Sequence, residues 1–244
     1  MMKLHIAAAV VVAGLSTGSA WAAPTYVLSG GPAAGDLTGW VAYLSSPPGE
    51  HVYVGLLSMN VTDTASSSTI NQTLWCTDIL DNFQSGGTYI LSSSSLADRL
   101  DVAKLGQINA LLAHAPSILG DPIAGAAVQA AIWEIENEAA DSGYDVTQPA
   151  LIVSVDGVTN ESAFLSDVSQ YLTYVTNGTW MPDRTQTVME YVPTDPLNNQ
   201  SFGFLQLDGG GRSIPTPEPA SLVLLGGGLA GLAALRRKKT RPAA

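Results

Sequence analysis

Two side chains of this sequence could react with each other. Cys76 is the only cysteine among the 244 residues and stands in the segment 74–78 (LWCTD), whereas Gln129 stands in the segment 128–133 (VQAAIW). A cysteine thiolate can attack the side-chain carbonyl of a glutamine and displace ammonia, which leaves a thioester. That reaction requires that the two groups be held at attack distance, that the oxyanion be stabilised and that water be excluded.

The residues around this pair favour the exclusion of water. Trp75 directly precedes the cysteine in an apolar segment. In a helix, Ile132 and Trp133 would fall three and four residues after Gln129 and would share its face. The alanines beside Gln129 would let this helix approach a strand closely. The amide carbon would then lie next to the thiol in a site without water.

Together the two segments resemble the motifs of the bacterial thioester domain, or TQXA domain, of surface adhesins. The segment 128–131 (VQAA) fits the hydrophobic-Gln-x-Ala motif of that family closely. The segment 75–78 (WCTD) fits the cysteine motif more loosely, since Trp75 replaces the usual Tyr, Phe or Leu and Thr77 replaces a hydrophobic residue. The resemblance covers roughly residues 38 to 207. It implies that Cys76 supplies the sulfur and Gln129 the acyl carbon.

The resemblance also implies a function. Such a bond acylates an amine once, so we expect covalent adhesion to an amine-bearing surface protein or matrix polymer, and not an enzyme. We expect no cofactor.

Two other interpretations of Cys76 stay open. A hydrolase or a transglutaminase-like enzyme would pair it with His114 and with Asp121 or Asn137, in the cysteine-histidine-acid order of such sites. No signature surrounds these residues, and a histidine at the end of a helix often complements the helix dipole. The other interpretation is a non-reactive structural matrix protein, in which Cys76 is a small buried hydrophobe.

The N-terminus predicts an export signal over residues 1–22. Lys3 is followed by an apolar run over residues 6–14 and by a small-x-small cleavage site at residues 20–22 (AWA). The run is too short to span a membrane and ends in polar residues, which favours a cleaved signal peptide. We therefore expect the mature chain to begin near Ala23.

The C-terminus, residues 216–244, resembles the PEP-CTERM sorting signal of Gram-negative bacteria. The resemblance rests on a tripartite order, in which the motif Pro217, Glu218 and Pro219 precedes an apolar stretch over residues 220–235 and the basic residues Arg236, Arg237, Lys238 and Lys239. As a helix this stretch would span roughly 24 Å, slightly less than a hydrocarbon core of about 30 Å. The alternative is an ordinary C-terminal membrane anchor.

This resemblance implies a route for the protein. The basic residues would stay cytoplasmic, and residues 23–215 would lie outside as one exported domain. An exosortase, a membrane-embedded cysteine protease, would cut near the Pro-Glu-Pro motif. We therefore expect a precursor anchored in the inner membrane and then a cell-surface or extracellular protein, part of an adhesive matrix or biofilm.

Charge excludes one class of partner. Without the two terminal signals the chain has 4 basic and 20 acidic residues, a net charge near −16. Nucleic acid is therefore not an expected partner, because phosphate backbones bind basic surfaces. A metal centre is not expected either, because His51 and His114 are the only histidines of the mature chain and lack the paired spacing of zinc sites.

Hydrophobic patterns predict the elements that would position the two residues. Alternating or apolar runs predict strands at 25–28, 40–44, 51–57, 73–77, 88–91, 151–155, 187–192 and 202–207. Helical spacing predicts one helix from Ser95 towards Pro116, another from an Asp121 N-cap to before Gly143, and a third around residues 162–175. The expected fold is therefore α+β, a mainly β body with an inserted helical segment, flanked by the signal peptide and a C-terminal transmembrane helix.

Overall fold

The computed structural model describes residues 23–207, apart from 33–36, 44–48, 80–82, 118–119, 139–142, 148–150 and 197–198. The predicted signal peptide and the predicted sorting signal lie outside the described residues. The elements follow one another as β1 (Thr25–Pro32), β2 (Leu37–Tyr43), β3 (Glu50–Val54), β4 (Leu57–Asp63), β5 (Thr69–Cys76), β6 (Gly87–Ser92), α1 (Ser95–Arg99), α2 (Val102–His114), the 3₁₀ turn η1 (Ala115–Ser117), α3 (Pro122–Asn137), β7 (Leu151–Val155), α4 (Val158–Thr176), β8 (Gln186–Pro193) and β9 (Phe202–Leu207).

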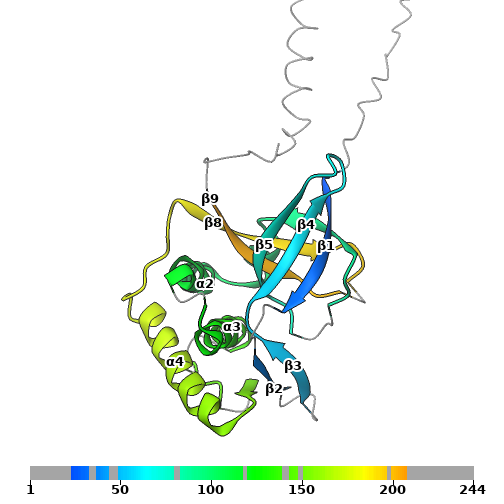
Figure 1. Ribbon diagram of the computed structural model, residues 1–244. Helices are drawn as coiled ribbons and strands as arrows, with labels where there is room; N and C mark the ends of the chain where they lie inside the picture. Colours follow the sequence, from blue (N-terminus) through cyan, green and yellow to red (C-terminus); the bar gives the residue numbers. More distant parts are fainter. Residues whose placement is uncertain are drawn as a thin grey trace, which may run out of the picture. The chain divides into compact units, whose positions relative to one another are not determined.

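Six strands close into an antiparallel barrel in the order β1-β4-β5-β9-β8-β6 (Figure 1). Alternate residues of these strands point inward, as Tyr26 and Leu28 of β1 and Met59 and Val61 of β4 do. Inside the barrel, Phe202 contacts Tyr89, with ring centroids 5.9 Å apart. The barrel therefore has its own apolar core, made of Tyr26, Leu28, Met59, Val61, Leu74, Tyr89, Tyr191, Phe202 and Phe204.

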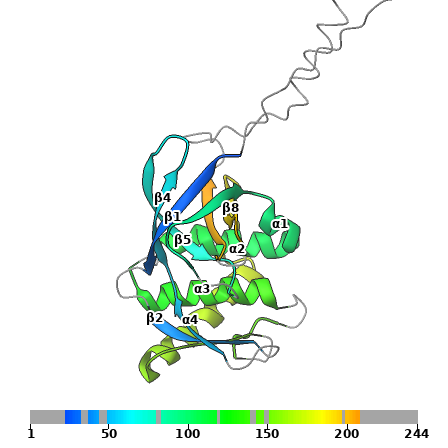
Figure 2. The same ribbon diagram turned by 90° about the vertical axis from the view of Figure 1, so that its right-hand side faces the viewer.

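Next to the barrel lie the helices and a small antiparallel sheet of order β3-β2-β7, with α3 between the barrel and β2 in Figure 2. Helix α3 packs against α2, α4 and all three strands of this sheet. It is buried almost all round, from Ala124 to Ile135, because alanines over most of its length let neighbouring elements approach closely. This helix therefore forms the centre of the second core.

The start of α3 follows the sequence prediction. The Asp121 carboxylate accepts hydrogen bonds from the backbone N–H groups of Ile123 at 2.9 Å and Ala124 at 3.4 Å, and Pro122 occupies the first turn. The helix predicted from Ser95, in contrast, is two helices. The side chain of Asp101 caps a new helix by accepting from Lys104 N, and Leu100 before it is extended.

The predicted fold class is confirmed for the described residues, because α1, α2 and α3 lie between β6 and β7 of a mainly β body. The single strand expected over residues 51–57 is wrong. Gly55 separates β3 from β4, and its φ of +148° is a backbone conformation that residues with a side chain rarely adopt. None of the described helices is long and apolar enough to span a membrane, and the predicted transmembrane stretch 220–235 lies outside the described residues.

Candidate functional site

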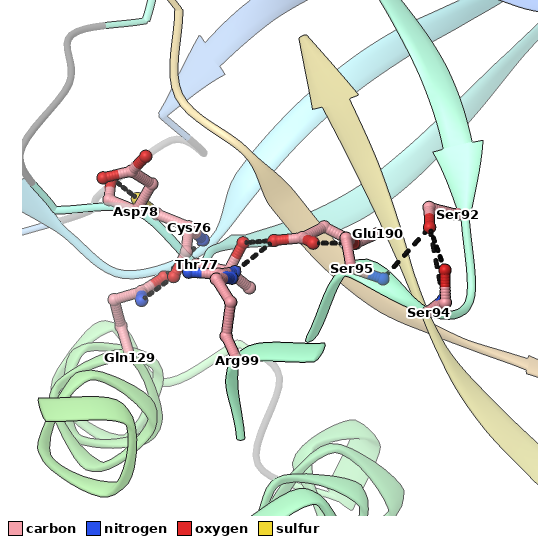
Figure 3. Close-up of polar contacts among 9 residues, drawn as sticks. All are labelled: Cys76, Thr77, Asp78, Ser92, Ser94, Ser95, Arg99, Gln129 and Glu190. Carbon is pink, nitrogen blue, oxygen red and sulfur yellow. Dashed lines mark hydrogen bonds and ion pairs between the residues drawn. The ribbon is translucent and has the colours of Figure 1, made fainter. Parts of the chain in front are cut away.

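Cys76 and Gln129 meet where the barrel contacts the helical layer. Cys76 is the last residue of β5, and Gln129 lies in the middle of α3, with its side chain directed at the end of that strand (Figure 3). The backbone N–H of Cys76 donates to Gln129 Oε1 at 2.9 Å, and Gln129 Nε2 donates to the Cys76 carbonyl at 2.7 Å. Both polar atoms of the amide are thus bonded to the residue that carries the sulfur.

These two hydrogen bonds fix the orientation of the Gln129 amide relative to the Cys76 backbone. A tetrahedral intermediate would place negative charge on Gln129 Oε1, and the Cys76 N–H lies within the distance range of an oxyanion-hole donor. The bond from Nε2 fixes the amide plane and holds the nitrogen that would leave as ammonia. The arrangement therefore provides orientation and one oxyanion donor.

The site is closed to solvent. Cys76 is 5% exposed and Gln129 is fully buried. Burial raises the pKa of the Cys76 thiol, against the lowering effect of a backbone hydrogen bond with Asp78, and the negative charges of Glu136 and Asp78 raise it further. The thiol donates to the Asp78 carbonyl at 2.8 Å. The nucleophilic thiolate is therefore disfavoured unless a nearby base takes the proton.

The predicted surroundings are buried around this pair. Ile132 is fully buried and Trp133 is 2% exposed, both one turn after Gln129 on α3. The indole N–H of Trp133 is buried and has no hydrogen-bond partner among the described residues. Trp75 precedes Cys76 in the strand and lines a cavity with Gln72, Leu112 and Phe204.

A buried ionic network holds the residue after Cys76. The Glu190 carboxylate on β8 accepts from the hydroxyl of Thr77 at 2.5 Å and from the Arg99 guanidinium at 2.8 Å (Figure 3). It also accepts from the hydroxyl of Ser95, so that α1, β8 and the end of β5 are joined. Because Glu190 is 1% exposed, these hydrogen bonds and the ion pair with Arg99 replace the contacts with water that its carboxylate loses on burial. The network therefore anchors the chain next to Cys76.

Sequence reasoning did not single out Glu136, a carboxyl of α3. It lies seven residues after Gln129, and its charge raises the pKa of the Cys76 thiol. Its Oε1 atom is buried and has no hydrogen-bond partner among the described residues, although part of the residue reaches the surface. The spacing of seven from Gln129 was the available signal, since it returns to the same helix face.

The residues of the alternative Cys-His site have other contacts. His114 stacks on Trp180 with ring centroids 4.9 Å apart, and Asp121 caps α3. The side chain of Asn137 donates to the Trp133 carbonyl at 2.8 Å. In the described parts of the chain, Cys76 has no hydrogen bond to a histidine, and His51 pairs with Asp156 at 2.9 Å. The described residues also hold no group of three metal-ligating side chains.

Comparison with known proteins confirms the C-terminal motif. Residues 215–238 match the family model of the PEP-CTERM protein-sorting motif, which covers the predicted Pro217, Glu218 and Pro219 and the apolar stretch. The chain therefore carries a sorting signal of this family and belongs among exported proteins. No curated protein matches the chain.

Several solved structures are similar to this chain. The N-terminal domain of the Streptococcus pyogenes pilus tip adhesin Cpa has 14% identity and a TM-score of 0.42, over 73% of this chain and 98% of that one. An N-terminal thioester domain of a Clostridium perfringens surface protein has 13% identity and a TM-score of 0.41, over 75% and 99%. The N-terminal thioester domain of the Streptococcus pyogenes fibronectin-binding protein SfbI has 9% identity and a TM-score of 0.45, over 71% and 95%.

Proposed function

We propose that Cys76 and Gln129 form an internal thioester, which the exported protein uses to acylate an amine on a surface protein or a matrix polymer. The observation that carries the proposal is the pair of hydrogen bonds between the Gln129 amide and the Cys76 backbone. A buried glutamine can be satisfied by many backbone groups. Here both of its polar atoms bond to the only cysteine in the chain.

The reaction exchanges one bond for another. Cys76 Sγ attacks Gln129 Cδ, the carbonyl oxygen takes up negative charge against the Cys76 N–H, and the carbon-nitrogen bond breaks to release ammonia. A lysine amine of a partner later attacks the same carbon, which frees the thiol and leaves an amide. Each molecule reacts once, so the protein is an adhesin and not an enzyme.

The burial of Cys76 and Gln129 and the acidic charge of the exported part both support a role in covalent adhesion. A bond between a 5% exposed and a fully buried residue is shielded from hydrolysis. The exported part carries a net charge near −16, which attracts cationic, amine-bearing partners.

The proposal also includes the route by which the protein leaves the cytoplasm, which rests on the PEP-CTERM motif. An exosortase would cut near the Pro-Glu-Pro motif and convert an inner-membrane precursor into a surface or extracellular protein. The membrane-spanning role of residues 220–235 and the cytoplasmic place of Arg236, Arg237, Lys238 and Lys239 belong to the same proposal.

Intact mass spectrometry of the purified native protein tests the bond. The wild-type protein is expected to weigh one ammonia less than its sequence, and Cys76→Ala and Gln129→Ala are each expected to have full mass. Methylamine is expected to open the wild-type bond, leaving a methylamide on Gln129 and a free thiol on Cys76. A full-mass wild-type protein with a titratable thiol would refute the thioester and leave the structural matrix protein as the better interpretation.

A further inference from the structure

The small sheet β3-β2-β7 has one face packed on the helical core and another that faces solvent. Alternate residues of its strands, such as Val41 of β2 and Val153 of β7, are buried in the core that α3 centres. The residues between them point the other way. Trp40, Tyr53 and Ile152 on that side are 52%, 59% and 40% exposed. We call this side the outer face of the small sheet.

The register of the strands brings these three side chains onto one diagonal. Trp40 lies opposite His51 of β3 and Ser154 of β7. On β3, Tyr53 is two residues beyond His51, and on β7, Ile152 is two residues before Ser154. Diagonal neighbours on one face of a sheet are about 7–8 Å apart, within reach of aromatic side chains. The outer face therefore presents a continuous apolar stripe with two aromatic rings to solvent.

A carboxylate is held across the same face. Asp156 directly follows β7, and its Oδ2 atom accepts a hydrogen bond from the hydroxyl of Thr38 on the middle strand β2. The same oxygen is bonded to His51 Nε2 on β3, at 2.9 Å. The ring of His51 in turn contacts Trp40 in a T-shaped arrangement, with centroids 5.1 Å apart. The Asp156 carboxylate is thus fixed beside the aromatic stripe, while its side chain stays 49% exposed.

The outer face combines this carboxylate with an absence of permanent positive charge. Strands β2, β3 and β7 contain no lysine or arginine. The lysine and arginines of the described residues lie on α1, on α2 and before β8, at Arg99, Lys104 and Arg184. Hydrogen bonds from Thr38 and then from His51 hold the pKa of the Asp156 carboxyl below its ordinary value, so this group is negative at neutral pH.

We propose that the outer face of the small sheet is a docking site for a polypeptide segment rich in lysine or arginine. The exposed rings of Trp40 and Tyr53 attract ammonium and guanidinium groups, and the Asp156 carboxylate supplies the opposite charge beside them. A second copy of this chain would bring a net charge near −16 of its own, and nucleic acid would bring phosphates. Both would be repelled where a cationic segment is attracted.

The docking site is separate from the thioester site. Helix α3 packs against the strands of the small sheet, while Gln129 of the same helix is directed at the end of β5. A segment bound to the outer face therefore leaves Cys76 and Gln129 unobstructed. The inference adds non-covalent capture to the proposed function and does not depend on the thioester, so the two can be measured separately.

Fluorescence anisotropy with a labelled peptide of alternating lysine and glycine measures this binding. The protein is the full chain with Cys76→Ala, in which no thioester can form. The test variants, made in this background, are Trp40→Ala, Trp40→Phe and Asp156→Asn. The matched controls are Ile70→Ala, at an exposed apolar residue of β5, and Asp98→Asn, which removes an exposed carboxylate of α1. A second peptide with every lysine acetylated keeps the length but loses the charge.

We expect Trp40→Ala and Asp156→Asn each to weaken binding about fivefold or more, as truncation of a central interface residue does. Trp40→Phe should have an intermediate effect, because tryptophan attracts cations more strongly than phenylalanine. Ile70→Ala and Asp98→Asn should leave the affinity unchanged. The acetylated peptide should lose most of the binding, and added salt should weaken binding of the unmodified peptide. Circular dichroism checks that each variant is folded.

Four outcomes would overturn the inference. The peptide does not bind, or Trp40→Ala and Asp156→Asn bind it as well as the parent protein does. Equal losses in the test variants and in the two controls would show a diffuse attraction to the acidic surface. Equal binding of the acetylated peptide, or its displacement by a neutral oligosaccharide, would show that the face recognises a group other than a cation. The mass test of the thioester is independent of all four.

Discussion

If the proposed thioester forms, opening it without changing the sequence should destabilise the fold by a calculable amount. The crosslink would close a loop of 53 residues, the separation of Cys76 and Gln129. Restricting a loop of this length in the unfolded chain is worth about 4 kcal/mol in the loop-entropy model. Ammonia would reverse the proposed crosslink and regenerate Gln129, so the crosslinked and the opened protein would share one sequence.

The opened form recovers part of this loss. Its amide nitrogen again donates to the Cys76 carbonyl, as in the 2.7 Å contact, and the thioester has no nitrogen to make that bond. One such hydrogen bond contributes about 1 kcal/mol, so the expected net difference is about 3 kcal/mol. For a domain of this size, that corresponds to a shift in Tm of about 6–12 °C.

Urea unfolding at low temperature and mildly acidic pH measures the difference while hydrolysis of the thioester is slow. The intact mass of each sample verifies the state of the bond before and after the titration. Cys76→Ala, treated with ammonia in the same way, controls for effects of the treatment itself. Equal urea midpoints for the crosslinked and the opened protein would refute the loop-entropy reasoning.

Three further predictions concern the residues that position the site. Arg99→Met removes the guanidinium from the buried Glu190 carboxylate and should lower the free energy of unfolding in urea by about 2 kcal/mol. The control Arg184→Met, at an exposed position, should change it very little, and equal losses in the two variants would contradict the role of the network. Asp121→Ala removes the cap of α3 and should cost about 1 kcal/mol by the same assay, and an unchanged midpoint would mean that the cap is not needed. Burial, the largest cause, raises the pKa of Glu134 to about 7 from an ordinary 4.5, so the folded protein binds more protons between these pH values and wild-type stability should fall as pH rises through them. Glu134→Gln should flatten that slope in urea titrations at several pH values, and an unchanged slope would show that Glu134 is not its source.

Local patterns were sufficient where a structural feature depends on neighbours in the chain. Asp121 before Pro122 marks a helix start because both residues act within the first turn. The alternation in 151–155 (LIVSV) predicted β7 with its observed bounds. The same kind of reasoning missed β4 over Leu57–Asp63, since its exposed polar residues read as loop. Pairing with β1 and β5 on either side makes this segment a strand.

By itself, the sequence determined the identity of the reactive candidates. A single cysteine, a glutamine followed by Ile132 and Trp133 at helical spacing, and the terminal sorting motif are all readable without coordinates. Residues three, four or seven apart in a helix share a face whatever surrounds the helix. The order of elements, with helices inserted between strands, followed from the same periodicities.

Only the tertiary structure decided which of these groups meet. Cys76 and Gln129 are 53 residues apart, and they touch because the end of β5 packs against the middle of α3. Glu134 and Glu136 look alike in the sequence, yet Glu134 accepts a hydrogen bond from the backbone N–H of Asp145, whereas Oε1 of Glu136 has no partner among the described residues. A pattern of side chains fixes which face of an element is apolar, but the element that covers this face depends on long-range packing, which no local spacing encodes.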